Sequence, residues 1–439
     1  MKLNYGKKEI QISIQDKNII QILNSSKQKI LLQPEDWLKE ILKNPINSPS
    51  LKNLLIQKKA EKVLIIVNDI TRPTPYDVIL PPLLEELHHI GIKKENIIFI
   101  IATGSHRGNS KEEIKEIFGE DIAGCYKFIN HDDQKSQMKD FGQLKSGNRL
   151  LVNSLVSEVD FVITTGVIVP HYFAGFSGGR KSILPGICGR KTIEANHANM
   201  VHPDARAGNL KGNPVHEEMQ EAAERVGVDF NINVVTNENH QIIEIVAGEL
   251  YASWLKGVEV CKKTYLCPIK HKAEVVITSP GGYPKDINVY QAQKALENAY
   301  QAVTPGGTII LLAECPEGYG QATFERWIEE ASSIDDIINR LKKKFVLGGH
   351  KAFGIARVAK EVDVLLISSL PQDKVRKLFL IPMENINQAL NYVKEKHGED
   401  FKAYILPLGN TVLPYRYLRP ILDQRKSNYL KYSISIGLS

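Results

Sequence analysis

One short segment of this sequence, residues 170–186, combines the residue types that a small-molecule binding loop needs. Between Pro170 and Pro185 it holds three glycines, three aromatic residues, His171 and an Arg-Lys pair ending at Lys181. Dense glycine favours close approach of the backbone to a ligand or positive φ angles, whereas a plain linker is polar and lacks aromatic residues. A lysine held in such a loop can act as a nucleophile or covalent anchor when it is partly desolvated. The alternative is a solvated lysine in a flexible loop.

A nucleotide-binding P-loop is the first alternative for this segment. That motif has Gly, four residues, and then Gly-Lys-Ser/Thr. Counting from Gly175 puts Arg180 where the second glycine belongs, followed by Lys181 and Ser182. The segment therefore departs from the P-loop pattern at a defining position.

Two histidine positions suggest proton transfer. His106 and His171 lie in different polar loops, each after an apolar run. An imidazole with a pKa near roughly 6.5 can accept or donate a proton at neutral pH. Two such groups on either side of one carbon suit a reaction that runs from both faces, such as racemisation. The alternative is that both histidines cap backbone carbonyls.

His197 lies in a helical-looking segment beyond the glycine-rich loop, residues 194–200, and could be a single metal ligand. It has no histidine partner three or four residues away, so a metal site made of protein ligands alone is not indicated. The alternative is an ordinary polar helix residue with its hydrogen bonds satisfied.

A second set of polar residues could hold an anion. Arg72 lies between Thr71 and a proline and suits a bidentate contact to carboxylate or phosphate. Asp69 could pair with Arg72 or orient a histidine, and a structural salt bridge is the alternative. Tyr290 and Lys294 share a helical face by their spacing. A solvated helix face is the alternative for this second pair and for Gln291 beside them.

The elements that would position these residues are apolar runs at residues 63–67, 97–101, 159–163 and 275–278, each followed by a polar loop. Continuous Val/Ile runs separated by helices are typical of parallel strands covered on both faces. Ligands of such sheets bind at the carboxyl ends of the strands. We therefore expect the four loops to converge on one site, and the run at 159–163 to end at the polar residues 164–166.

The predicted fold class is α/β, with two domains that have largely parallel sheets and an active site in the cleft between them. The first domain is predicted to span residues 1–270 and the second 271–411, and the tail 412–439 is expected to pack back on the first. Alternating apolar residues at 10–14 and a second run at 19–23 predict an N-terminal hairpin.

Composition excludes several classes of protein. The net charge of +6 is small for 439 residues and gives no basic stripe for nucleic acid, but it agrees with a small anionic ligand. No apolar run reaches the length of a membrane span, and the N-terminus lacks the apolar core of a signal peptide. Five cysteines without close pairing suit a reducing cytoplasm.

Taken together, several segments resemble one family, the nickel-pincer-nucleotide lactate racemases. The segments run in order over about residues 5–415: Asp69-Ile70-Thr71-Arg72-Pro73, Thr103-Gly104-Ser105-His106-Arg107, the loop from His171 to Gly186, Glu194-Ala195-Asn196-His197 and Tyr290-Gln291-Ala292-Gln293-Lys294. No motif position departs from the family pattern.

The resemblance implies an isomerase that interconverts D- and L-lactate through transient hydride transfer to its cofactor. The cofactor is nickel in a pyridinium-3,5-bisthiocarboxylic acid mononucleotide, attached covalently at the residue matching Lys181, with His197 as the protein's nickel ligand. His106 and His171 are then the catalytic acid and base. The remaining implied roles are cofactor binding by Asp69, Thr71, Arg72, Tyr290 and Lys294, and substrate binding by Arg72, Gln291 and Lys294.

The resemblance also implies partners and leaves alternatives. The substrate would be a small anionic 2-hydroxy acid, and separate cofactor-making enzymes would be needed to load the protein. One alternative is a racemase or epimerase of a larger aliphatic, aromatic or dicarboxylic 2-hydroxy acid. A more distant one is a protein that binds a nucleotide or anion without catalysis.

Overall fold

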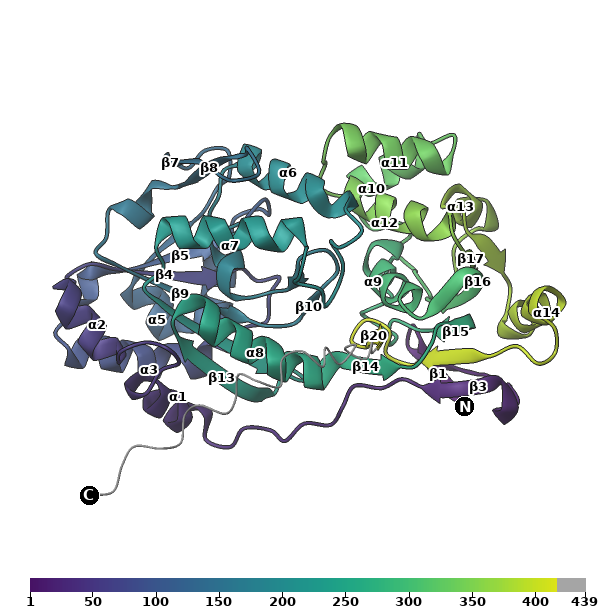
Figure 1. Cartoon of the computed structure of the whole chain (residues 1–439), viewed down its shortest axis with the longest axis horizontal. Helices are drawn as coiled ribbons and strands as arrows, with labels where there is room; N and C mark the ends of the chain where they lie inside the picture. The colour runs from purple at the N-terminus through teal and green to yellow at the C-terminus, as the bar shows by residue number, and fades with distance from the viewer. Residues whose placement is uncertain (417–439) are drawn as a thin grey trace, which may run out of the picture.

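The structure is a computed structural model that describes residues 1–416 of the 439-residue chain. Within these residues, two six-stranded sheets form the centres of two α/β halves (Figure 1). The first sheet has the order β13-β12-β9-β4-β5-β6 and is parallel except for the antiparallel pair β12–β13. Its strands are β4 (Val63–Asn68), β5 (Ile97–Ala102), β6 (Lys127–Asn130), β9 (Phe161–Val167), β12 (Phe230–Thr236) and β13 (Ile242–Gly248).

The second sheet is parallel throughout and has the order β18-β17-β16-β15-β19-β3. Its strands are β3 (Ile19–Ile22), β15 (Ala273–Thr278), β16 (Val303–Leu312), β17 (Asp363–Ile367), β18 (Ile381–Met383) and β19 (Ala403–Leu406). The predicted α/β class with largely parallel sheets is therefore confirmed.

Helices surround both sheets (Figure 1). In the first half they are α1 (Pro34–Lys43), α2 (Leu51–Lys58), α3 (Tyr76–His89), α4 (Lys111–Phe118), α5 (Glu120–Cys125), α6 (Arg190–Ala198), α7 (Pro214–Val226) and α8 (Leu250–Tyr265). Those around the second sheet are α9 (Val289–Tyr300), α10 (Ala322–Glu329), α11 (Ile334–Lys343), α12 (Gly349–Ala359), α13 (Gln372–Lys377) and α14 (Ile386–His397).

Strand β4 shows why the apolar runs become central strands. Its odd-numbered residues Val63, Ile65 and Val67 pack in the core beneath α1, α2 and α3, whereas Leu64 and Ile66 pack in the core of the opposite face. A strand buried on both faces needs apolar residues at consecutive positions. The core that contains Leu64 and Ile66 continues into the second half through residues such as Val276 of β15, so the two halves share apolar packing.

Two local predictions were wrong. The N-terminal hairpin pairs β1 (Lys2–Tyr5) with β2 (Lys8–Gln11), whereas β3 leaves it and joins β19 in the second sheet. Strand β9 does not end at residue 163, because the hydroxyls of Thr164 and Thr165 are satisfied inside the sheet. Thr164 donates to the Asn231 side chain at 3.1 Å and Thr165 donates to the carbonyl of Ile66 at 2.8 Å.

The domain limits 1–270 and 271–411 stay a prediction, although the first residues of the chain lie against the second sheet. Of the predicted tail, β20 (Leu413–Arg416) pairs in parallel with β14 (Leu266–Ile269), and residues 417–439 lie outside the described part. Every helix within residues 1–416 is too short or too polar to cross a lipid bilayer.

Candidate functional site

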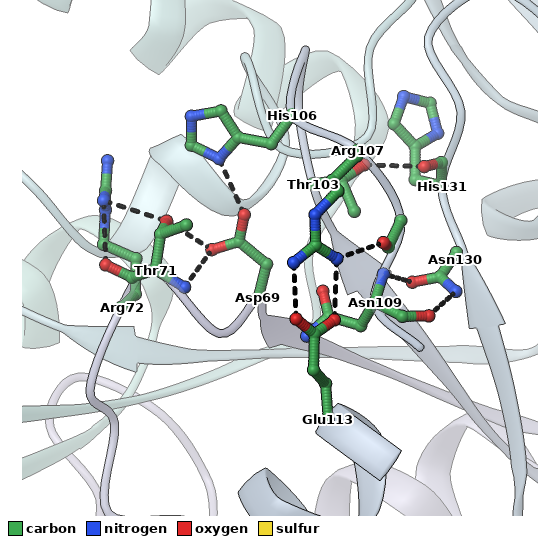
Figure 2. Close-up of polar contacts among 11 residues, drawn as sticks. Asp69, Thr71, Arg72, Thr103, His106, Arg107, Asn109, Glu113, Asn130 and His131 are labelled. Carbon is green, nitrogen blue, oxygen red and sulfur yellow. Dashed lines mark hydrogen bonds and ion pairs between the residues drawn. The ribbon is translucent and has the colours of Figure 1, made fainter. Parts of the chain in front are cut away.

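The loop after β4 and the loop after β5 meet through Asp69 and His106 (Figure 2). Asp69 Oδ2 lies 2.7 Å from His106 Nδ1. Asp69 Oδ1 accepts the Thr71 hydroxyl at 2.7 Å and the Thr71 amide at 3.2 Å. Arg72 donates to the Thr71 carbonyl and hydroxyl, each at 3.1 Å. Of the two partners predicted for Asp69, the structure therefore selects the histidine for hydrogen bonding.

The charge of the Asp69 carboxylate determines which ring nitrogen of His106 carries the proton. Burial by itself would raise the pKa of Asp69. The hydrogen bond and charge of His106, together with the Thr71 hydrogen bond and the Arg72 charge, outweigh burial and hold that pKa below its ordinary value. An ionised carboxylate only accepts hydrogen bonds. Nδ1 of His106 therefore carries a proton, and Nε2 is left as the basic nitrogen of a half-exposed ring.

His171 lies in the short strand β10 (Pro170–His171) at the start of the glycine-rich loop. Its Nδ1 accepts the amide of Ala174 at 3.3 Å, and the ring packs edge-on against Phe173 at 4.6 Å between centroids. Burial lowers the pKa of His171 well below its ordinary value, helped by the charges of Lys181 and Arg72 and, further, of His197 and Lys294. The structure thus gathers predicted site residues from four separate segments around this ring.

The glycine-rich loop is held in place by Arg180, whose side chain is fully buried. Its guanidinium donates to the carbonyls of Ala174 at 2.8 Å and Phe176 at 3.1 Å, and its Nε donates to His216 Nδ1 at 2.8 Å. It also stacks on Trp254 at 3.9 Å. His216 is therefore a core residue that positions this arginine.

Glycine is required where the loop passes Trp254. Gly179 has a φ of +52°, and a Cβ there would lie 2.7 Å from Cγ of Trp254. Neither the backbone conformation nor the space suits a side chain. The chain then enters a short 3-10 helix (Gly179–Ser182) that carries Lys181.

Lys181 is half-buried, and its amine makes no hydrogen bond or ion pair within residues 1–416. Its Nζ lies 5.7 Å from the ring centroid of Phe173. Burial lowers the pKa of Lys181 well below its ordinary value, and the charges of Arg72 and Arg180 lower it further. An uncharged amine is the nucleophilic form of lysine.

His197 lies near the end of α6 and is buried between two phenylalanine rings. The centroids of Phe173 and Phe345 are 5.0 Å and 5.3 Å from that of the imidazole, and both pairs are edge-on. Phe345 comes from the second half, so this contact joins the two halves at the site. Among the described residues no three histidine, cysteine or acidic side chains group as a metal site.

Helix α9 contributes Tyr290, Gln291 and Lys294. Lys294 keeps a solvent-exposed face, while its amine has a pKa lowered to about 8 by burial and by the charges of Arg72 and Lys285. Solvent screening limits this effect on such a side chain. The Gln291 side chain is exposed and makes no hydrogen bond among the described residues.

The structure adds two residues that the sequence reasoning missed, His350 and Lys351 in the first turn of α12. His350 stacks on Tyr172 at 6.0 Å, and Lys351 Nζ lies 5.6 Å from the Tyr172 ring and 5.0 Å from that of Tyr290. Burial and the charge of Lys294 lower the pKa of Lys351 to about 8. The Tyr172 hydroxyl is buried without a hydrogen-bond partner in residues 1–416. The Gly-Gly-His-Lys run at 348–351 was the available signal.

The fourth predicted loop, after β15, is used differently. Asp286 accepts the amide of Gly6, and Ser279 donates to the carbonyl of Asn4, so the N-terminal hairpin binds this loop. The first three loops are joined to one another, the third through the carbonyl of Gly186, which accepts the Gly104 amide at 2.9 Å. The fourth loop acts on the site through the charge of Lys285 near Lys294. The predicted position of the site in a cleft between domains stays a prediction.

Comparison with known proteins agrees with this arrangement. Residues 5–208 match the family model of the lactate racemase N-terminal domain, and residues 269–413 match that of the lactate racemase C-terminal domain. The lactate racemase of Thermoanaerobacterium thermosaccharolyticum is 36% identical over 423 residues, which cover 94% of this chain and 98% of the relative. The chain belongs to the lactate racemase family.

Other relatives agree with this membership. The lactate racemase of Lactiplantibacillus plantarum is 33% identical over 421 residues, covering 94% of this chain and 98% of the relative. The solved lactate racemase apoprotein of T. thermosaccharolyticum superposes with a TM-score of 0.86 at 35% identity, over 94% of this chain and 99% of that structure. A Thermotoga maritima protein shares the fold, with a TM-score of 0.62 at 21% identity over 89% of this chain and all of that one.

Proposed function

We propose that this protein interconverts D- and L-lactate and that His106 and His171 are its acid and base. Family membership supports the reaction. The observation that carries the assignment to residues is the Asp69–His106 pair together with the unpaired amine of Lys181, in surroundings made cationic by Arg72.

We further propose that the cofactor is a nickel-pincer nucleotide, with Lys181 as its covalent anchor and His197 as the nickel ligand. The residues present fit such a group. The Lys181 amine has no competing partner in the described chain and a lowered pKa, and within residues 1–416 His197 belongs to no group of three possible metal ligands. A lone ligand suffices when the organic group brings its own donors, and nickel(II) accepts nitrogen and sulfur ligands in a square plane. When bound, the group would supply a reversible hydride acceptor, which protein side chains lack.

The part of the protein in this proposal is to bind, orient and exchange protons. His106 Nε2 takes the hydroxyl proton from one enantiomer while Asp69 stabilises the imidazolium that results. The Nδ1 of His171 accepts the Ala174 amide at 3.3 Å, so the neutral ring carries its proton on Nε2 and presents that N–H to the substrate oxygen. To act as the base for the other enantiomer, the ring must give up this contact and carry its proton on Nδ1. A planar keto acid held between the two rings can then be returned to either enantiomer.

Anion binding falls to the cations of the site. Arg72 and Lys294, with Gln291, would hold the substrate carboxylate, and Asp69, Thr71 and Tyr290 would support the cofactor. Burial is the main cause of the lowered pKa values of Lys294 and Lys351, and repulsion from neighbouring cations lowers them further. A carboxylate or phosphate would relieve that repulsion.

The experiment that tests the proposal is intact-mass and metal analysis of the chain after co-expression with cofactor-making enzymes, which loading would require. Wild-type protein should carry one nickel-containing adduct on the Lys181 peptide, and Lys181→Ala should carry none. Chiral chromatography of reactions with enantiopure 2-hydroxy acids then decides the substrate. An adduct-free wild-type protein that still racemises lactate would refute the cofactor assignment, and a loaded protein that converts only larger or dicarboxylic acids would refute lactate.

Two organisational proposals accompany this function. The domain division near residue 270 is supported by the two sheets, whose strands from β4 to β13 and from β15 to β19 lie on either side of it. A cytoplasmic location is supported by the five cysteines, which are all free thiols.

A further inference from the structure

The side chain of Asn196 connects the proposed nickel ligand to the interior of the protein. Asn196 is fully buried on α6, and its Nδ2 donates to the Val215 carbonyl at 3.2 Å and to Glu218 Oε2 at 2.8 Å. Its Oδ1 lies 3.1 Å from Nδ1 of His197. Because both partners of Nδ2 only accept hydrogen bonds, the amide orientation is determined by the network.

This orientation also determines the proton on His197. A carbonyl oxygen can only accept, so Nδ1 of His197 must be the donor in the contact with Asn196. Nε2 then carries the lone pair that a metal needs. The ring is buried between Phe173 and Phe345, so it has no room to exchange the roles of its two nitrogens by turning over.

The far end of the network is an unusual carboxylate. Glu218 on α7 is 5% exposed and accepts three neutral donors: Asn196, Asn148 at 2.6 Å and Ser146 at 2.5 Å. No lysine, arginine or histidine within residues 1–416 forms an ion pair with it. A buried carboxylate without a cation is costly, and the three hydrogen bonds from neutral donors offset this cost and hold the carboxylate against Asn196.

We propose that Asn196 and Glu218 are positioning residues for the metal site. Glu218 polarises the amide of Asn196, and the oxygen of that amide fixes the orientation of the His197 ring and increases the electron density on it, so that Nε2 binds nickel. The inference rests on the proposed function for the identity of the metal. Histidine ligands usually donate their second nitrogen to a carboxylate or carbonyl, and losing that partner typically costs about 10- to 100-fold in metal affinity. Here an asparagine stands between the ring and the carboxylate.

The test uses the full chain loaded with cofactor and compares Asn196→Ala and Glu218→Gln with the wild type. Nickel release to a chelator is followed by metal analysis, and the visible absorption of the metal is recorded. Asn196→Ala should release nickel at least about tenfold faster and shift the absorption band, and Glu218→Gln should fall between it and the wild type. The adduct on Lys181 should survive in both.

Glu221→Gln is the matched control, because Glu221 lies on the same helix and also accepts hydrogen bonds, from the Lys145 amide and from Arg225. It should release nickel at the wild-type rate with an unchanged band. If Asn196→Ala and Glu218→Gln behave like this control, the inference is wrong.

A measurement on the apoprotein keeps the inference testable if Asn196→Ala does not fold. Nitrogen-15 NMR of histidine-labelled wild-type protein should show His197 protonated at Nδ1, and protonation at Nε2 would overturn the inference. The two claims have separate readouts. Absence of any adduct in wild-type protein co-expressed with the cofactor-making enzymes refutes the proposed cofactor, whereas an adduct together with His197 protonated at Nε2 in the apoprotein refutes only the role of Asn196 and Glu218.

Discussion

Removing the charge of Asp69 tests how the site prepares His106 as a base. The Thr71 hydroxyl and amide donate to Asp69 Oδ1 at 2.7 Å and 3.2 Å. In Asp69→Asn these two donors therefore orient the amide so that its oxygen faces Thr71. The new NH2 group then faces His106 Nδ1, where the carboxylate oxygen lay at 2.7 Å. A donor there requires Nδ1 to be unprotonated, which places the proton on Nε2 and removes the base from the substrate side.

The size of the effect follows from the bond that is lost. A hydrogen bond to a charged group contributes about 1.5–3 kcal/mol, and about 1.4 kcal/mol corresponds to a factor of ten in rate. We therefore expect kcat/KM for lactate to fall by about 10- to 150-fold. Because the enantiomers have equal free energies in solution, the fall must be the same in both directions.

The assay is chiral chromatography of initial rates with D- and with L-lactate, using protein whose loading is checked by intact mass. Asp132→Asn is a control, because the Asp132 side chain accepts hydrogen bonds only from backbone amides in the loop after β6. Rates within twofold of wild type in fully loaded Asp69→Asn would refute the reasoning that the carboxylate sets the proton on His106.

Three further predictions concern the acid–base pair, the anion site and the loop. His171→Ala should suppress racemisation while the covalent adduct survives in intact-mass analysis, and full activity would remove it from the acid–base role. Lactate affinity of the apoprotein, measured by calorimetry, should fall as the pH rises through about 8, because Lys294 and Lys351 lose their charge there. Lys351→Met should weaken this dependence, the double change of Lys294 and Lys351 to Met should flatten it, and a flat wild-type profile would contradict the prediction. Gly179→Ala should lower the free energy of unfolding by about 2–5 kcal/mol, because residue 179 has a positive φ and a Cβ there would contact Trp254. The loss should exceed that of Gly119→Ala, because Gly119 has a φ of +81° but open space around it. Equal urea midpoints for the two alanine variants would contradict this.

The sequence predicted most of the central strands because burial on both faces demands consecutive apolar residues, as in β4 and β5. It also predicted that His106 and His171 follow the carboxyl ends of such strands. It failed where polar groups are satisfied at long range. Thr164 and Thr165 continue β9 because they bond to Asn231 and Ile66, and neither partner can be identified from the local pattern.

What the sequence determined by itself was the chemistry available: an amine in a glycine-rich loop, imidazoles after strands, and cations for an anionic ligand. Tertiary structure alone decided which groups act on one another. In the fold, His106 is the hydrogen-bond partner of Asp69, Lys351 lies near the rings of Tyr172 and Tyr290, and β3 pairs in the second sheet. The physical reason is range. Strand and turn preferences depend on neighbours along the chain, whereas hydrogen bonds, ring contacts and pKa shifts depend on distances of a few ångströms between segments that only the fold brings together.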